Sequence, residues 1–190
     1  MKKSIFLLFL FLGGCQFFGM ITNGLHRVYS MAADDRTAVD DWSDVGINMA
    51  VRDALGKKKA ALMIDVEVTV FEGAVLLTGT VPKAEVLNEI LEATWSVKGV
   101  KKVYNYVRAD DTPKLLDTAA EAAKATQIKA QLALTAGIDS VNYKLILENG
   151  TVYLMGICAG EEEYQKVMSV LKNTDGVEKI VYLMRLPIEE

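Results

Sequence analysis

The sequence predicts an α+β protein made of two tandem copies of an α-β-β-α-β unit. Segments 73–79 and 150–156 align without a gap at an offset of 77 residues, and segments 99–103 and 176–180 align at the same offset. A similarity that recurs at a fixed spacing indicates a tandem duplication. Within each copy, apolar residues recur first at helical spacing and then in alternation, which is typical of helices and strands that bury one face.

The first copy is expected to open with an amphipathic helix and a β-hairpin. The apolar residues Ile47, Val51, Ala54 and Leu55 share one helical face, and Gly56 follows where the helix is expected to end. Apolar residues then alternate with polar ones over 65–70, as in a strand buried on one side. Residues 72–73, Glu-Gly, turn the chain into a second strand over 75–81.

A second helix and a last strand complete the first copy. Pro82 suits the first turn of a helix, where its missing N–H costs nothing. The apolar stripe of that helix consists of Val86, Ile90, Ala93 and Val97. Gly99 ends the helix, and residues 103–108 alternate as one final strand.

The second copy repeats this order. An Ala-rich segment from about residue 119 to residue 134 favours a helix, and Asn149-Gly150 is a preferred hairpin turn. Three glutamates at 161–163 open the next helix, where acidic groups complement the helix dipole. Cys158 follows the predicted strand 153–157. Ordinary packing of its small apolar thiol is favoured over a reactive or intermolecular role.

The amino terminus has the pattern of an export signal. A charged start at 1–3 precedes an apolar run at 5–12, which is far shorter than the roughly 20 residues of a membrane-spanning helix. Residues 12–15, Leu-Gly-Gly-Cys, resemble the lipobox of bacterial lipoproteins, which implies cleavage after Gly14 and acylation of Cys15. Gln16, rather than an aspartate, follows the cysteine, and by resemblance to enterobacterial lipoproteins this favours the periplasmic face of the outer membrane. The alternative is a secreted protein whose cysteine lies beside the cleavage site by chance.

Charge and cysteine content limit the classes of partner. Without the two lysines of the leader the chain has 19 basic and 25 acidic residues, a net charge near −6. Because nucleic acid binding usually needs a basic surface, nucleic acid is not an expected partner, and contact with acidic lipid must be local. If Cys15 is acylated, Cys158 is the only other thiol, so no intrachain disulfide is expected.

The sequence gives little support for catalysis. His26 is the sole histidine, so no histidine-based triad or multi-histidine metal site can form. The glutamates at 161–163 point in different directions from consecutive helix positions, which favours a helix-start role over metal ligation or acid/base chemistry. The glycines punctuate turns and strand ends and form no phosphate-binding loop. We expect no enzyme, no metal and no cofactor.

The element order and two short motifs resemble the BON domain. The hairpin signature Glu-x-Gly-x-Val-x-Leu-x-Gly is present at 148–156 and, more loosely, at 72–79, and Gly-Val-x-x-Val or a close variant follows at 99–103 and 176–180. Val103-Tyr104-Asn105 adds a further match. The resemblance implies that each copy has a three-stranded mixed sheet packed against two helices. It also implies a structural role for the signature glycines Gly73, Gly79, Gly99, Gly150, Gly156 and Gly176.

Two such domains behind a lipobox resemble the dual BON-domain outer-membrane lipoproteins, the DolP-like group. The expected organisation is a signal peptide at 1–14, a lipidated tether at 15–42, BON domains at 43–109 and 117–187, and a linker at 110–116. The resemblance implies a non-catalytic envelope protein that binds phospholipid membrane and supports outer-membrane integrity. Some relatives have an aromatic residue early in the first helix of the second domain, where this chain has Ala123 and Ala125. The second copy is also acidic, with 7 basic and 11 acidic residues over 117–190, against 9 and 8 over 44–108.

Candidate membrane contacts lie beside the anchor and after the first helix. Aromatic and apolar residues sit well at a lipid interface, and four follow the cysteine: Phe17, Phe18, Met20 and Ile21. Lys57, Lys58 and Lys59 could meet lipid phosphate, although a charge run is more often a solvated loop, and the same holds for the lysines at 101–102. The competing hypothesis is an adaptor that binds envelope or division proteins and that the lipid anchor merely localises.

Overall fold

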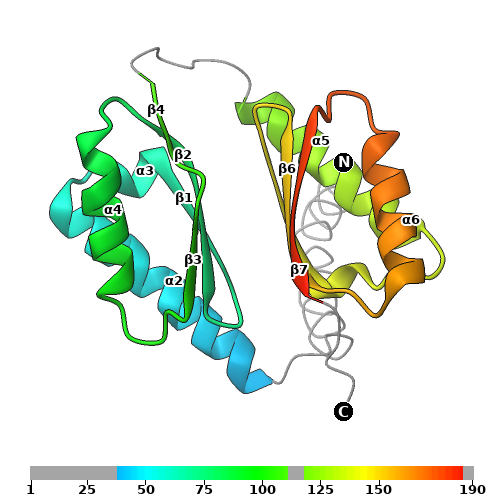
Figure 1. Cartoon of the computed structure of the whole chain (residues 1–190), viewed down its shortest axis with the longest axis horizontal. Coiled ribbons are helices and arrows are strands. Elements are labelled where there is room, and N and C mark those ends of the chain that lie inside the picture. The colour runs from blue at the N-terminus through cyan, green and yellow to red at the C-terminus, as the bar shows by residue number, and fades with distance from the viewer. Residues whose placement is uncertain (1–37, 111–117, 186–190) are drawn as a thin grey trace, which may run out of the picture. The chain divides into compact units, whose positions relative to one another are not determined.

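A computed structural model describes residues 38–110 and 118–185 of the chain, with side chains over 43–110 and 120–185 (Figure 1). The first copy contains α2 (Ala38–Lys58), the short helix α3 (Leu62–Asp65), β1 (Val66–Phe71), β2 (Ala74–Val81), α4 (Glu85–Trp95), β3 (Lys102–Asn105) and β4 (Arg108–Ala109). The second contains α5 (Thr118–Leu134), the 3-10 turn η1 (Ser140–Asn142), β5 (Tyr143–Glu148), β6 (Thr151–Ile157), α6 (Glu161–Lys172) and β7 (Lys179–Arg185).

Both copies have the same mixed sheet. β1 runs antiparallel to β2, and β3 and β4 run parallel to β2. In the second copy β5 runs antiparallel to β6, and β7 runs parallel to it. The pairing of Val75 with Val103 recurs as Val152 with Ile180, at the 77-residue offset of the sequence repeat. The α+β duplication predicted from the sequence is confirmed.

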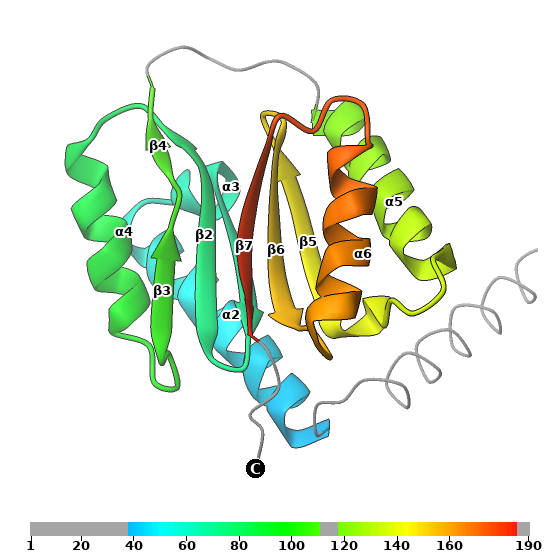
Figure 2. The same cartoon turned by 45° about the vertical axis from the view of Figure 1, so that its right-hand side comes forward.

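Each sheet has helices on one face, α2 and α4 in the first copy and α5 and α6 in the second (Figures 1 and 2). The predicted apolar stripes form the cores under these helices. Val51, Leu55 and Ile90 are fully buried against β1 and β2, and Ile128, Leu132 and Leu171 are buried against β5 and β6. Burial of this kind contributes roughly 25 cal/mol for each Å² of apolar surface removed from water.

A third apolar cluster joins the two copies. The described residues all belong to one compact unit. Side chains alternate across a strand, so β2 turns Val75 and Leu77 toward its helices and Leu76 toward the opposite face. Buried residues on these opposite faces of both sheets pack together, namely Phe71, Leu76, Ile146, Tyr153 and Met155.

Two expectations about helix ends are wrong. α2 continues through Gly56 to Lys58. A glycine inside a helix costs about 1 kcal/mol, which the packing of Val51 and Leu55 outweighs. A Cβ at Gly56 would lie 2.5 Å from the Met63 sulfur, so the glycine also permits the close approach of α3. Pro82 precedes α4 by three residues and is not in its first turn, because the helix starts after Ala84.

The last strand of the first copy is interrupted, so this sheet departs from the expected three continuous strands. β3 ends at Asn105 and β4 begins at Arg108. The Asn105 side chain accepts a hydrogen bond from Val107 N at 3.1 Å, and Tyr106 N donates to Leu77 O at 2.8 Å. In the second copy Tyr182 replaces the asparagine, and β7 runs unbroken. A local Asn turn therefore competes with the strand in the first copy only.

Candidate functional site

The predicted anchor lies outside the described residues. Cys15, Phe17, Phe18, Met20 and Ile21 all precede residue 38, where the described structure starts. The site that can be built from side chains therefore consists of the predicted lysines, the signature glycines and the polar groups around the two hairpins. Within the described ranges, no helix is long and apolar enough to cross a bilayer.

Each of the three predicted lysines has an acidic neighbour. Lys57 pairs with Asp53 at 2.6 Å, and the other two lysines reach α4, Lys58 with Glu92 at 3.6 Å and Lys59 with Glu89 at 3.4 Å. The lysine side chains remain 45 to 75% exposed. Pairs this exposed contribute at most about 1 kcal/mol each, so the ammonium groups can exchange partners with little cost.

Most of the exposed large apolar side chains in the described residues belong to the first copy. Val45 and Met49 lie one turn apart on α2, Met63 and Ile64 lie on α3, and Trp95 ends α4. The large apolar side chain of Ile64 is 87% exposed. Among the described residues of the second copy, Leu134 at the end of α5 is the corresponding exposed large apolar residue.

The signature glycines lie where the backbone excludes other residues. Gly79 and Gly156 have φ values of +122° and +149°, and a Cβ at either would overlap a backbone carbonyl oxygen, that of Asp65 or Asn142. These glycines allow β1 and β5 to start close against β2 and β6. The remaining four also have positive φ and lie in the turns: Gly73, Gly99, Gly150 and Gly176.

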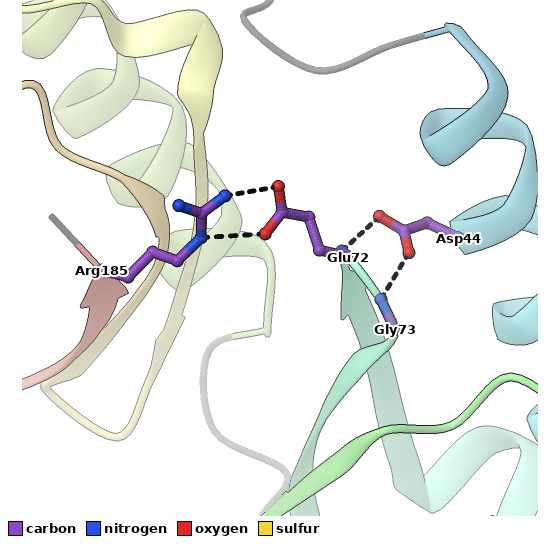
Figure 3. A network of polar contacts seen from close by, with 4 residues as sticks. All are labelled: Asp44, Glu72, Gly73 and Arg185. Carbon is purple, nitrogen blue, oxygen red and sulfur yellow. Dashed lines mark hydrogen bonds and ion pairs between the residues drawn. The ribbon is translucent and has the colours of Figure 1, made fainter. Parts of the chain in front are cut away.

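An acidic residue in the first helix of each copy holds the hairpin turn. Asp44 is 5% exposed and accepts hydrogen bonds from Glu72 N at 2.7 Å and Gly73 N at 2.8 Å (Figure 3). At the equivalent position of the second copy, Glu121 accepts from Asn149 N. Neither contact was predicted from the sequence, although the two acidic residues follow the same 77-residue offset as the glycines.

Polar contacts at the edge of the third cluster tie the copies together. Arg185 donates to both carboxylate oxygens of Glu72, at 2.8 and 3.0 Å, while the Glu72 N–H is held by Asp44 (Figure 3). Glu148 accepts from Gly79 N at 2.9 Å. Burial raises the pKa of Glu148, and the hydrogen bond from Gly79 and the nearby Arg108 only partly oppose this shift.

A buried polar cluster distinguishes the second copy. Glu163 is 7% exposed and accepts from Asp139 N at 2.6 Å, from Ala159 N at 2.7 Å and from the Cys158 thiol at 3.7 Å. Burial alone raises the pKa of Glu163, but the hydrogen bonds to its carboxylate outweigh burial and lower it. Burial also raises the pKa of Tyr143, whose ring lies in the core below. From the sequence, Glu163 was predicted only to favour the start of a helix.

Cys158 is fully buried beside this cluster, and its thiol lies 3.3 Å from Gly160 O. Across the described part of the chain, no group of three or more histidine, cysteine, aspartate or glutamate side chains is arranged to hold a metal ion. The cluster can fix the loops before η1 and before α6, because one carboxylate binds the backbone of both.

Comparisons with known proteins support the resemblance read from the motifs. The family model described as BON domain matches residues 43–111 and 118–187. The chain is 38% identical over 122 residues to the "Uncharacterized protein in gshII 5'region" of Anaplasma centrale, covering 64% of this chain and 81% of that protein. It is 25% identical over 178 residues to "Outer membrane lipoprotein DolP" of Haemophilus influenzae, covering 93% and 90%.

A third relative is the "21 kDa hemolysin" of Actinobacillus pleuropneumoniae, with 26% identity over 162 residues that cover 82% of this chain and 80% of that protein. Both family matches coincide with the two α-β-β-α-β units and contain all six signature glycines. This chain belongs to the BON-domain family and carries two BON domains in tandem.

Proposed function

We propose that this protein is a lipid-anchored BON-domain protein on the periplasmic face of the outer membrane, where it binds phospholipid and supports the integrity of that membrane without catalysing a reaction. The observation that carries the proposal is the match to an outer membrane lipoprotein over 93% of this chain and 90% of the relative. The Leu-Gly-Gly-Cys motif ahead of the BON domains agrees with it.

The anchor supplies most of the membrane affinity. Each buried methylene of an acyl chain contributes roughly 0.8 kcal/mol, and two or more chains make attachment stable. Acylation of Cys15 would place Phe17, Phe18, Met20 and Ile21 within a few residues of the bilayer surface. Such residues favour the lipid interface and would extend the anchor.

The first BON domain is the better candidate for further bilayer contact. Met63 and Ile64 are exposed and follow the last of the lysines at 57–59 by four and five residues. Apolar side chains beside cations are the combination that favours an anionic lipid surface. The second domain is acidic, and its α5 carries alanines at 123 and 125 where some relatives have an aromatic residue.

Mass spectrometry of the chain purified from membranes tests the anchor. We expect an amino terminus at Cys15, with the added mass of a diacylglycerol and an acyl group. A Cys15→Ser variant should leave the membrane fraction after a salt wash. Unmodified Cys15 in the mature wild-type chain would overturn the anchor.

Co-sedimentation with vesicles tests the lipid contact of the folded part. The mature chain with Cys15→Ser should sediment with phosphatidylglycerol vesicles and less with phosphatidylcholine vesicles. Ile64→Ser, or Lys57→Gln combined with Lys58→Gln, should lower the bound fraction. Leu134→Ser is the matched control, since Leu134 and Ile64 are both 87% exposed. Equal losses for the two serine variants would contradict contact through the first domain.

The second candidate function is an envelope adaptor that the lipid merely localises. The acidic second domain favours it, since 11 acidic and 7 basic residues oppose contact with anionic lipid. It predicts that the Cys15→Ser chain binds an envelope or division protein and does not sediment with either kind of vesicle.

A further inference from the structure

The unpaired edges of β1 and β5 differ in whether a helix side chain hydrogen-bonds to them. Among the described strands, β1 pairs only with β2, and β5 pairs only with β6, so each sheet has an edge where backbone N–H and C=O groups can accept another strand. In the first copy Asn48 on α2 covers this edge, because its Nδ2 donates to Val68 O at 2.6 Å. A side chain of the covering helix thus occupies a backbone acceptor of β1.

The second copy lacks this cover. At the 77-residue offset Ala125 stands in place of Asn48, and Leu145 in place of Val68. An alanine methyl group cannot donate a hydrogen bond. No other side chain in the described ranges donates to the Leu145 carbonyl either.

A groove of about 660 Å³ lies along this uncovered edge. Small residues of α5, Ala122, Ala125 and Thr126, form one wall, and residues 145–149 of β5 and its turn form another. The strand beside the groove has six residues, which span about 20 Å in extended form. Four of these residues, 145–148, line the groove and offer the backbone partners that an extended peptide segment requires.

Charge selects the kind of segment. Of the lining residues within the described ranges, four carry carboxylates, namely Asp65, Glu67, Glu121 and Glu148, and one is a cation, Lys129. Glu121 and Glu148 accept hydrogen bonds from backbone N–H groups, whereas Asp65 ends α3 and Glu67 is the second residue of β1. This lining repels lipid phosphate and nucleic acid and attracts lysine or arginine side chains.

We propose that the groove along β5 binds an extended, basic segment of a partner protein, which adds as a strand to the edge of the second sheet. Backbone hydrogen bonds to β5 hold the segment, and the acidic rim selects its charge. The proposal goes beyond the lipid-binding function and does not depend on it, because vesicle binding and peptide binding are measured separately.

Titration with a synthetic peptide tests the groove. The probe is a blocked eight-residue peptide of alternating lysine and valine, added to the mature chain with Cys15→Ser. We expect saturable binding, with slower amide hydrogen exchange at Leu145 or Leu147 of β5 and unchanged exchange at Val68 and Val70 of β1. A peptide of alternating glutamate and valine, and the lysine peptide interrupted by a central proline, should both bind at least about tenfold more weakly.

A variant that gives the second copy the asparagine of the first tests the proposal most directly. Ala125→Asn should place an amide donor beside Leu145 O and weaken the lysine peptide by about tenfold. Ala123→Asn is the matched control, since Ala123 is exposed on the same helix and does not line the groove. Equal affinity of the Ala125→Asn and Ala123→Asn chains would overturn the proposal. So would an absence of binding by the wild-type chain, or protection confined to β1.

Discussion

Replacement of Asp44 should destabilise the first domain, because its carboxylate accepts two hydrogen bonds from the hairpin turn. Its carboxylate accepts from Gly73 N in a buried contact and from Glu72 N in a partly buried one. Hydrogen bonds to a charged group contribute roughly 1.5–3 kcal/mol, and a buried donor left without a partner costs about 1–3 kcal/mol. Because water can reach the Glu72 N–H, we expect Asp44→Ala to lower the free energy of unfolding by about 3 kcal/mol.

Asp44→Asn should lose less than Asp44→Ala, because its single amide oxygen still accepts one bond. The control is Asp53→Ala, which removes an exposed ion pair on the same helix and should change stability by less than about 0.5 kcal/mol. Urea denaturation followed by tryptophan fluorescence reports on the first domain, since Trp42 and Trp95 are the two tryptophans of the chain.

With an m value of about 2 kcal/mol/M, a loss of 3 kcal/mol lowers the urea midpoint by about 1.5 M. If Asp44→Ala shifts the midpoint no more than Asp53→Ala does, water satisfies both turn N–H groups and the capping argument is wrong.

Three further changes test the turns and the contacts between the domains. Gly156→Ala should lower the thermal midpoint strongly, because the new Cβ would overlap Asn142 O, whereas Gly160→Ala meets nothing within 4 Å and should be tolerated. Arg185→Gln should cost about 0.5–1 kcal/mol by losing its two bonds to Glu72, and in thermal scans the difference should shrink at high salt. Burial raises the pKa of Glu148 above its ordinary value of 4.5, so the folded chain holds this proton to higher pH than the unfolded chain, and stability should fall as the pH rises above about 4.5. Thermal scans from pH 4 to pH 7 should show that Glu148→Gln flattens this fall.

Periodicity predicted the parts of the fold that rest on local rules. The turns at 72–73 and 149–150 have two consecutive residues with positive φ, which is the geometry that Asn-Gly favours. The alternating valines of β1 and the helical stripe through Val51 and Leu55 are buried as expected. These signals are local, because a turn residue favours a particular backbone conformation and an apolar residue favours the buried face of its helix or strand.

Contacts between distant residues were not predictable in the same way. Asp44 binds a turn 28 and 29 residues away, and Arg185 reaches Glu72 across 113 residues. An isolated Asp or Arg carries no periodic signal of such a partner. The ends of α2 and α4 were missed for a related reason, since tertiary packing kept Gly56 inside a helix and left Pro82 outside one.

Comparison of the two copies separates what the fold requires from what each domain adds. Valines at 66, 81 and 86 become Tyr143, Cys158 and Glu163 in the second copy, yet both sheets keep the same register. The fold therefore does not need the polar cluster, and a buried carboxylate is destabilising unless it is fully hydrogen-bonded.

The bonds of Glu163 to Asp139 N and Ala159 N fix two loops that the first copy leaves to apolar packing. Most of the exposed large apolar residues belong to the first copy, whereas the strand edge without a side-chain cover belongs to the second. Under the two functions proposed above, duplication would let the first domain face lipid while the edge strand of the second binds protein.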